Sequence, residues 1–234
     1  MKSKQMFLTQ SNFLRHLTKS EYKMLREMCR YSNNLYNCAV YEVRQHFFKT
    51  NEYIPYKKYY YTCKLNENYK LLQAGVAQQT LKVVERSFKS FFALLKLKRE
   101  GKYTEKVRIP KYRKKGDMFN LVLSTNAITI HNGMLTFPMS RAFSKQHDRP
   151  QIRIAVPDRL KGKEFREIRI IPLYKGKHFK IQYCCKVEPE PKNLNKDNSI
   201  SIDIGVDNLA SCITNIGTSF IMDGRKIKSI NRYW

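Results

Sequence analysis

Asp203 is the residue of this sequence whose type and position most directly indicate chemistry. It follows the apolar residues Ile200 and Ile202 of a strand-like pattern, and Gly205 stands two residues beyond it. A glycine there lets the backbone turn sharply or be approached closely. A carboxylate at a strand end can ligate Mg²⁺, although such sites combine several carboxylates with water and substrate phosphate. The pattern also fits a turn residue, because Asp side chains hydrogen-bond to nearby backbone in turns.

The residues after Asp203 predict two more strands, LASCITN and GTSFIMD, and therefore a three-stranded antiparallel meander. A carboxylate on the first strand of such a meander begins the active site of ribonuclease H-like nucleases, where carboxylates hold two Mg²⁺ ions beside the scissile phosphate. The same D-x-G pattern opens the phosphate-binding hairpin of sugar kinases and actin-like ATPases. That alternative needs glycine-rich phosphate loops downstream, and the sequence up to Trp234 offers no room for them.

The net charge indicates which partners to expect. The chain has 45 Lys and Arg against 19 Asp and Glu, a formal net charge of +26. Such a charge attracts polyanions, and nucleic acid is the leading partner. A membrane surface is the alternative, but the basic residues are spread along the whole chain instead of lying on one amphipathic helix. Because the sequence contains neither a transmembrane-length apolar run nor a secretory signal, we expect a cytoplasmic protein without a membrane partner.

The six cysteines indicate ordinary reduced thiols and no zinc site. None of them forms a C-x-x-C pair, which is the spacing of a zinc ribbon. The histidines also lack ligand spacing.

The pattern of apolar residues, capping residues and turns divides the chain into a helical region, a β-rich region and a linker. Residues 18–101 are predicted to be helical, with a capping box at Thr18 and Glu21, a break near residues 51–55 and a stop at Gly101. Residues 102–190 carry short strand patterns separated by turns, typical of an antiparallel barrel or sandwich. Residues 1–17 supply its first strand, so the helical region is an insertion. Residues 191–198 form a linker, and the fold class is α+β.

Two basic segments are predicted to contact nucleic acid. Residues 96–116 hold ten Lys or Arg against two Glu, and residues 54–64 interleave tyrosines with lysines. Charge can follow a single strand while aromatic rings stack on its bases, although a solvated linker and structural tyrosines explain the same pattern. The predicted contacts from these segments and the second long helix are Lys57, Lys58, Tyr59, Tyr60, Lys82, Arg86, Lys111, Arg113, Lys114 and Lys115.

The segment SIDIGVDNLASCITNIGTSFIMDGRKIKSINRYW resembles the first nuclease motif of the TnpB (OrfB) family. These are insertion-sequence-encoded RNA-guided nucleases, long called transposase accessory proteins, and are related to the compact type V CRISPR effectors. The segments LYNCAVYEVR, AQQTLKVVERSFKSFFALLK and VRIPKYRKK resemble upstream parts of the same family. The resemblance therefore covers essentially the whole chain.

This resemblance implies an architecture and a mechanism. An OB-like β-barrel wedge with a helical recognition insertion precedes a RuvC-type domain, of which residues 199–234 hold the first motif. A noncoding guide RNA from the element's end directs the protein to target DNA beside a short motif, and Mg²⁺ supports the cut. By position, Asp203 is the first catalytic carboxylate and a Mg²⁺ ligand. Gln78 and Gln79 lie on a helix facing the duplex, whereas Asp207 and Asp223 are interpreted as turn residues.

The sequence departs from the family after this motif. A later glutamate, a four-cysteine zinc ribbon and a last aspartate do not occur in it. We therefore expect a C-terminally truncated chain that does not cleave DNA by itself. The alternatives are a non-catalytic RNA- or DNA-binding module or repressor, a decaying gene remnant, and a general RNA-binding or ribosome-associated basic protein.

Overall fold

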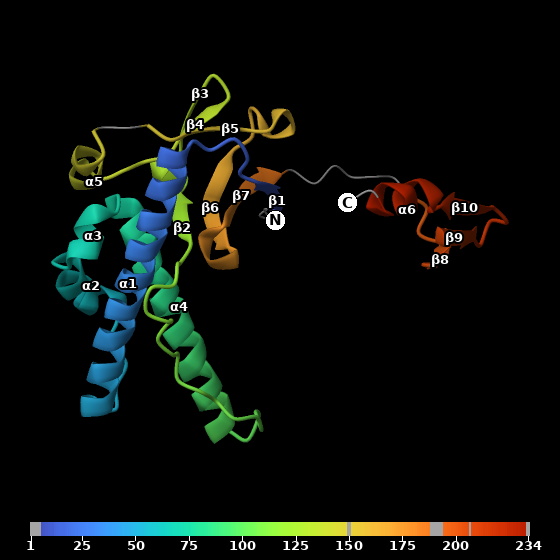
Figure 1. Ribbon diagram of the computed structural model, residues 1–234. Coiled ribbons are helices and arrows are strands. Elements are labelled where there is room, and N and C mark those ends of the chain that lie inside the picture. Colours follow the sequence, from blue (N-terminus) through green and yellow to red (C-terminus); the bar gives the residue numbers. More distant parts are fainter. Residues whose placement is uncertain (1–5, 149–150, 188–193, 206, 233–234) are drawn as a thin grey trace. The chain divides into compact units, whose positions relative to one another are not determined.

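The computed structural model describes residues 6–148, 151–187, 194–205 and 207–232 (Figure 1). The chain divides into two compact units, Met1–Glu188 and Pro189–Trp234. Both units contain helix and antiparallel sheet, so the predicted α+β class is confirmed at this level. Within the described residues no helix has both the length and the apolar character needed to cross a bilayer. Of the predicted linker, residues 191–193 lie outside the described residues.

The helices of the first unit lie where the sequence pattern predicts helix, with one addition. Two of them are long, the predicted break at residues 51–55 is non-helical, and two short helices lie between this break and the second long helix. The addition is a short helix within the β-rich part of the chain. Their bounds are α1 Lys19–Thr50, α2 Tyr56–Lys64, α3 Glu67–Leu71, α4 Ala74–Arg99 and α5 Arg141–Gln146.

The ends of the long helices follow local rules. The Thr18 hydroxyl accepts a hydrogen bond from the backbone N–H of Glu21 at 3.2 Å, and the Glu21 carboxylate accepts one from the backbone N–H of Thr18 at 2.8 Å. This is the predicted capping box at the start of α1. The helix α4 ends at Arg99, and Gly101 follows with φ +71°, a conformation that favours glycine. The predicted stop is therefore confirmed.

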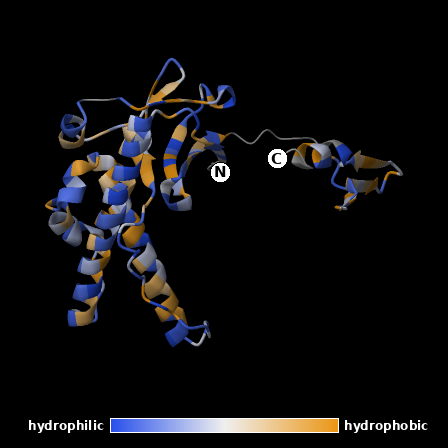
Figure 2. Ribbon diagram, viewed as in Figure 1, coloured by the Kyte–Doolittle hydropathy of each residue, from blue (hydrophilic) through white to orange (hydrophobic). Residues whose placement is uncertain are grey.

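The strands of the first unit form two antiparallel sheets. One has four strands in the order β1-β7-β6-β2, and the other has three in the order β3-β4-β5. In the middle of β6, the exposed Arg169 lies between the buried Ile168 and Ile170, and the strand carries both hydrophobic and hydrophilic residues (Figure 2). The strand bounds are β1 Met6–Phe13, β2 Leu121–Ser124, β3 Thr129–His131, β4 Met134–Thr136, β5 Arg153–Ala155, β6 Phe165–Leu173 and β7 His178–Val187.

The predicted barrel is not closed among the described strands. In the four-stranded sheet β1 and β2 are the outer strands, and neither pairs with β3, β4 or β5. The 3-10 helix Thr125–Ala127 ends β2 after four residues, and the Asn132–Gly133 turn then folds β3 onto β4. The short strands consequently pair with each other, and the result is two open sheets.

The core of the first unit lies where α4 packs against both α1 and β2. Leu81, Val84 and Phe88 of α4 are fully buried, as are Leu121 and Leu123 of β2. Two hydroxyl groups also lie in this interface: Ser32 of α1 is 3.0 Å from Thr80 of α4 and donates to the Asn120 carbonyl oxygen at 3.0 Å. Their hydrogen bonds offset the cost of burying polar groups.

The second unit contains the predicted meander. Strands β8 Ile200–Asp203, β9 Asn208–Thr214 and β10 Ser219–Asp223 form an antiparallel sheet in the order β10-β9-β8, and helix α6 spans Arg225–Arg232. Most described residues of these strands are exposed within this unit, and Ala210 and Cys212 of β9 are buried. The three-strand prediction is confirmed.

Candidate nucleic-acid interface

Residues 107–115, here called the basic crossing, are held against α1 by side-chain to backbone hydrogen bonds. The Asn37 amide donates to the Arg113 carbonyl oxygen at 2.9 Å, and its oxygen accepts from the Arg113 N–H at 2.8 Å. The Asn33 amide donates to the Lys114 carbonyl oxygen at 3.1 Å, and the Arg44 guanidinium donates to the Pro110 carbonyl oxygen at 3.0 Å. The anchors on α1 are four and seven residues apart, so they share one face of the helix. The crossing is thus a backbone fixed to a helix, not a free linker.

This anchoring separates Arg113 from the other basic residues predicted to bind nucleic acid. The Arg113 guanidinium donates to Asn33 Oδ1 at 2.9 Å and to the Met118 carbonyl oxygen at 3.1 Å, and its carbon lies 4.7 Å from the Phe119 ring centroid. It also pairs with Asp117 at 3.4 Å. Its Nε and Nη2 groups are therefore engaged within the protein, and we assign Arg113 a positioning role.

The exposed lysines of the crossing keep their charge on the surface. Lys111, Lys114 and Lys115 are all exposed. Lys114 and Lys115 line a cavity of about 530 Å³ together with Lys175 from the turn between β6 and β7. Asp117, which pairs with Arg113, also lines this cavity, and the three lysines make it suited to a phosphate. Lys175 was not among the contacts predicted from the sequence, although it belongs to the basic turn Lys175-Gly176-Lys177, because only the fold brings it beside the crossing.

A stripe of polar residues on α4 carries three of the other predicted contacts. Gln79, Lys82 and Arg86 are three and four residues apart and therefore lie on one side of the helix. Lys82 and both predicted glutamines, Gln78 and Gln79, are half-buried, while Arg86 is exposed. The apolar stripe of α4 faces the core, so this polar stripe is directed away from it. The stripe is suited to contact a phosphate backbone.

The tyrosine-rich helix α2 gives a mixed outcome. Lys57 and Lys58 are exposed, and Tyr60 is half-buried. Tyr59, in contrast, is 1% exposed, and its hydroxyl donates to the Leu81 carbonyl oxygen at 3.0 Å. Burial raises the pKa of that hydroxyl. The prediction that Tyr59 stacks on a base is wrong for this structure, because its ring is packed in the core.

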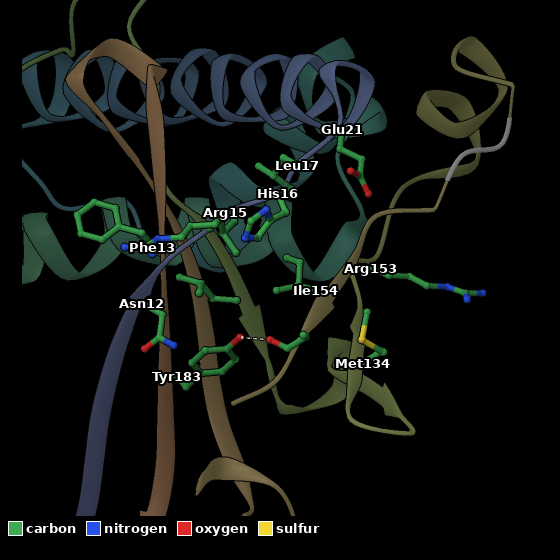
Figure 3. A pocket seen from close by; sticks show the side chains of 13 residues that line it. Asn12, Phe13, Arg15, His16, Leu17, Glu21, Met134, Arg153, Ile154 and Tyr183 are labelled. Carbon is green, nitrogen blue, oxygen red and sulfur yellow. Dashed lines mark hydrogen bonds between the residues drawn. The ribbon is translucent and has the colours of Figure 1, made fainter. Parts of the chain in front are cut away.

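A separate cavity lies where the end of β1 meets β4, β5 and β7 (Figure 3). It has a volume of about 380 Å³ and combines an apolar wall that includes Ile154 and Tyr183 with the basic side chains of Arg15, His16 and Arg153. The Tyr183 hydroxyl donates to the Ala155 carbonyl oxygen at 3.5 Å. None of the residues predicted from the sequence to bind nucleic acid or metal lines this cavity, since its walls come from four strands, the loop after β1 and Glu21 of α1.

The three aspartates that the sequence analysis considered in the second unit, Asp203, Asp207 and Asp223, differ in their surroundings. Asp203 is exposed at the end of β8, opposite Ser211 of β9. The other two predicted turn aspartates are engaged: Asp207 pairs with Lys228 at 2.7 Å, and Asp223 accepts from the Arg225 N–H at 2.9 Å. These hydrogen bonds hold the pKa of each carboxyl below its usual range.

The donor set around Asp203 does not fit the magnesium site that the family resemblance implies. Two Mg²⁺ ions require several carboxylates on one spot. The described residues contain no cluster of three or more His, Cys, Asp or Glu that could hold a metal ion. We therefore derive no catalytic step through a metal here.

Comparison with known families bears on the C-terminal part of the chain. The OrfB_IS605 family, described as a probable transposase, matches residues 182–234. The resemblance to the TnpB/OrfB family is confirmed over these residues. The OrfB match covers the end of β7 and the second unit, including the strand that ends at Asp203. The helical region and the basic crossing lie outside the OrfB match.

Two solved structures are similar to the chain. One is a CRISPR-Cas12f ternary complex, with 12% identity, a TM-score of 0.44 and coverage of 92% of this chain and 50% of the other. The second is a Cas12f1–sgRNA–target DNA complex, with 12% identity, a TM-score of 0.49 and coverage of 92% and 52%. The chain thus spans about half the length of these structures. The search of curated proteins gave no match.

Proposed function

We propose that this chain is a TnpB-like, insertion-sequence-encoded protein that binds a guide RNA and target DNA. The OrfB match at residues 182–234 supports the family, and the net charge of +26 supports a polyanionic partner. The RuvC-like character of β8–β10, the OB-like character of the sheets in the first unit and RNA-guided cleavage by intact relatives belong to this proposal.

The observation that carries the proposal is the basic crossing fixed on α1. Lys111, Lys114 and Lys115 extend from a backbone whose carbonyl and N–H groups are hydrogen-bonded to Asn33 and Asn37. A fixed backbone lowers the entropy lost when these lysines meet a phosphate chain. A solvated linker would have its backbone hydrogen-bonded to water, whereas this backbone is hydrogen-bonded to the side chains of Asn33, Asn37 and Arg44.

A second candidate is a binding module without catalysis. The observation that favours it is that the described residues, Asp203 included, contain no group of three or more His, Cys, Asp or Glu that could hold a metal ion. In this form of the proposal the protein binds nucleic acid and does not cut it. Such a protein acts by occupying its RNA or its DNA site.

Binding is tested with the purified chain and the RNA encoded at the 3′ end of its gene, over a series of salt concentrations. Neutralised phosphates release counterions, so log K is expected to fall linearly with log salt, with a slope of about −0.7 to −0.9 per phosphate contact. We expect a slope that corresponds to several contacts. A slope near zero, or the absence of binding at low salt, contradicts the proposed function.

Cleavage is tested with the same RNA, a labelled DNA target library and Mg²⁺, comparing the wild type with Asp203→Asn. The non-catalytic candidate predicts no cleavage product from either protein and equal nucleic-acid affinity for both. Guide-dependent cleavage that Asp203→Asn abolishes would show that the chain is a nuclease and would remove the second candidate.

A further inference from the structure

We propose that Phe48, Arg44 and Tyr112 form a stacking platform for an unpaired nucleobase of a single-stranded nucleic acid. The inference rests on the proposed nucleic-acid binding and adds to it a specific site and a substrate class. The three residues were not among the contacts predicted from the sequence. Two of them lie on α1, and the third lies on the basic crossing.

The platform is built around one guanidinium. The Arg44 guanidinium carbon lies 5.3 Å from the Phe48 ring centroid and 5.0 Å from the Tyr112 ring centroid. These distances are those of cation–π contacts, in which the cation lies over a ring. The same guanidinium donates to the Pro110 carbonyl oxygen at 3.0 Å, which fixes the crossing two residues before Tyr112. Arg44 therefore holds one ring from each element.

Both rings remain available to a ligand. Phe48 is 59% exposed and Tyr112 is 45% exposed. The neighbouring Phe47 serves the core instead, with its ring centroid 5.3 Å from that of Phe92. A single exposed aromatic ring on a protein surface needs no explanation. Two exposed rings that contact the same guanidinium are less common, and this contact fixes the conformations of both rings before a ligand binds.

The charge around the platform matches a nucleic-acid backbone. Lys49 follows Phe48 and Lys111 precedes Tyr112, and both lysines are exposed. A base that stacks on either ring would place its phosphates within the reach of these long cationic side chains. Aromatic rings beside a positively charged track are the means by which proteins hold single strands. In a duplex the flat face of an internal base is covered by its neighbours, so the platform selects unpaired bases.

The test measures binding of the full chain to 12-nucleotide single strands of RNA and of DNA, and to a duplex of the same sequence. Phe48→Leu and Tyr112→Leu keep apolar area but remove the π face, whereas Tyr112→Phe keeps the ring. Phe7→Leu is the matched control, because Phe7 is also an exposed ring, at 48%, and lies on β1. Thermal unfolding shows whether each variant is folded. A single strand that carries 2-aminopurine reports stacking by its fluorescence.

We expect Phe48→Leu and Tyr112→Leu each to weaken single-strand binding by about 5-fold or more. Duplex affinity should stay within about 2-fold, and Tyr112→Phe and Phe7→Leu should bind like the wild type. The two single strands show whether the site distinguishes ribose from deoxyribose. Wild-type single-strand binding that neither Leu variant weakens overturns the platform and leaves the proposed function standing. Equal losses on strand and duplex also overturn it, and a wild type that binds no nucleic acid overturns both proposals.

Discussion

The side chain of Asn37 pairs with the backbone of Arg113 in both directions. Its amide donates to the Arg113 carbonyl oxygen at 2.9 Å, and its oxygen accepts from the Arg113 N–H at 2.8 Å. The Asn37 side chain thus makes the two backbone hydrogen bonds that a neighbouring strand would make in a sheet. It satisfies both polar groups of a residue that has no strand partner.

Replacing Asn37 with alanine should destabilise the protein through this pair. Two backbone groups of a partly buried residue lose their partner, which costs about 1–3 kcal/mol. Equilibrium unfolding in urea measures the change. Asn34→Ala is the matched control, because Asn34 is exposed and its amide donates to Asn68 Oδ1 at 3.2 Å. We expect the control to stay within about 0.5 kcal/mol. Equal stability of the two variants would contradict the anchoring role.

Tyr59→Phe separates the structural tyrosine from the candidate contacts on α2. The variant loses the hydrogen bond to the Leu81 carbonyl oxygen, at a cost of about 0.5–1.5 kcal/mol in the free energy of unfolding. Its nucleic-acid affinity should equal that of the wild type, because the ring is buried. The double variant Lys57→Gln/Lys58→Gln should bind more weakly with unchanged stability. Weaker binding by folded Tyr59→Phe would show that this ring reaches the ligand.

Lys82→Gln/Arg86→Gln should reduce the salt dependence of binding. Each lost phosphate contact lowers the magnitude of the slope of log K against log salt by about 1. In the double variant the magnitude of this slope should therefore fall by about 2 if both residues contact phosphate. Lys23→Gln, at an exposed position on α1, should leave the slope unchanged. An unchanged slope in the double variant would remove the α4 stripe from the interface.

Tyr183 should make the folded state sensitive to alkaline pH. Burial raises the pKa of Tyr183 to about 12, against about 10 in an unfolded chain. Between these values the unfolded state releases the proton while the folded state keeps it, so stability is complete below about pH 10 and falls as the pH rises. This residue contributes a decline of about 1.4 kcal/mol per pH unit in that window. Urea unfolding at a series of pH values should therefore give a shallower decline for Tyr183→Phe. If the free energy of unfolding fell equally steeply with pH in the wild type and in Tyr183→Phe, the raised pKa of Tyr183 would not be the cause of the decline.

Local patterns in the sequence predicted the local structure well. Thr18 and Glu21 are three residues apart, so their reciprocal hydrogen bonds were predictable without any knowledge of the fold. The same holds for the stop at Gly101 and for the strands that end at Asp203 and Asp223. The predicted barrel is not closed among the described strands. Strand patterns indicate which residues form strands but not which strands become neighbours.

The sequence by itself determined the helical and β-rich regions, the meander whose first strand ends in Asp203, and the strongly basic character. Only the tertiary structure decided which basic and aromatic residues are free to bind. Arg113 and Lys114 are neighbours in one basic run, yet one is held by Asn33 and the other lines a surface cavity. The physical reason is that capping and periodicity depend on residues within a few positions. The exposure of a side chain depends on partners such as Asn33 and Arg44, which lie far away in the sequence.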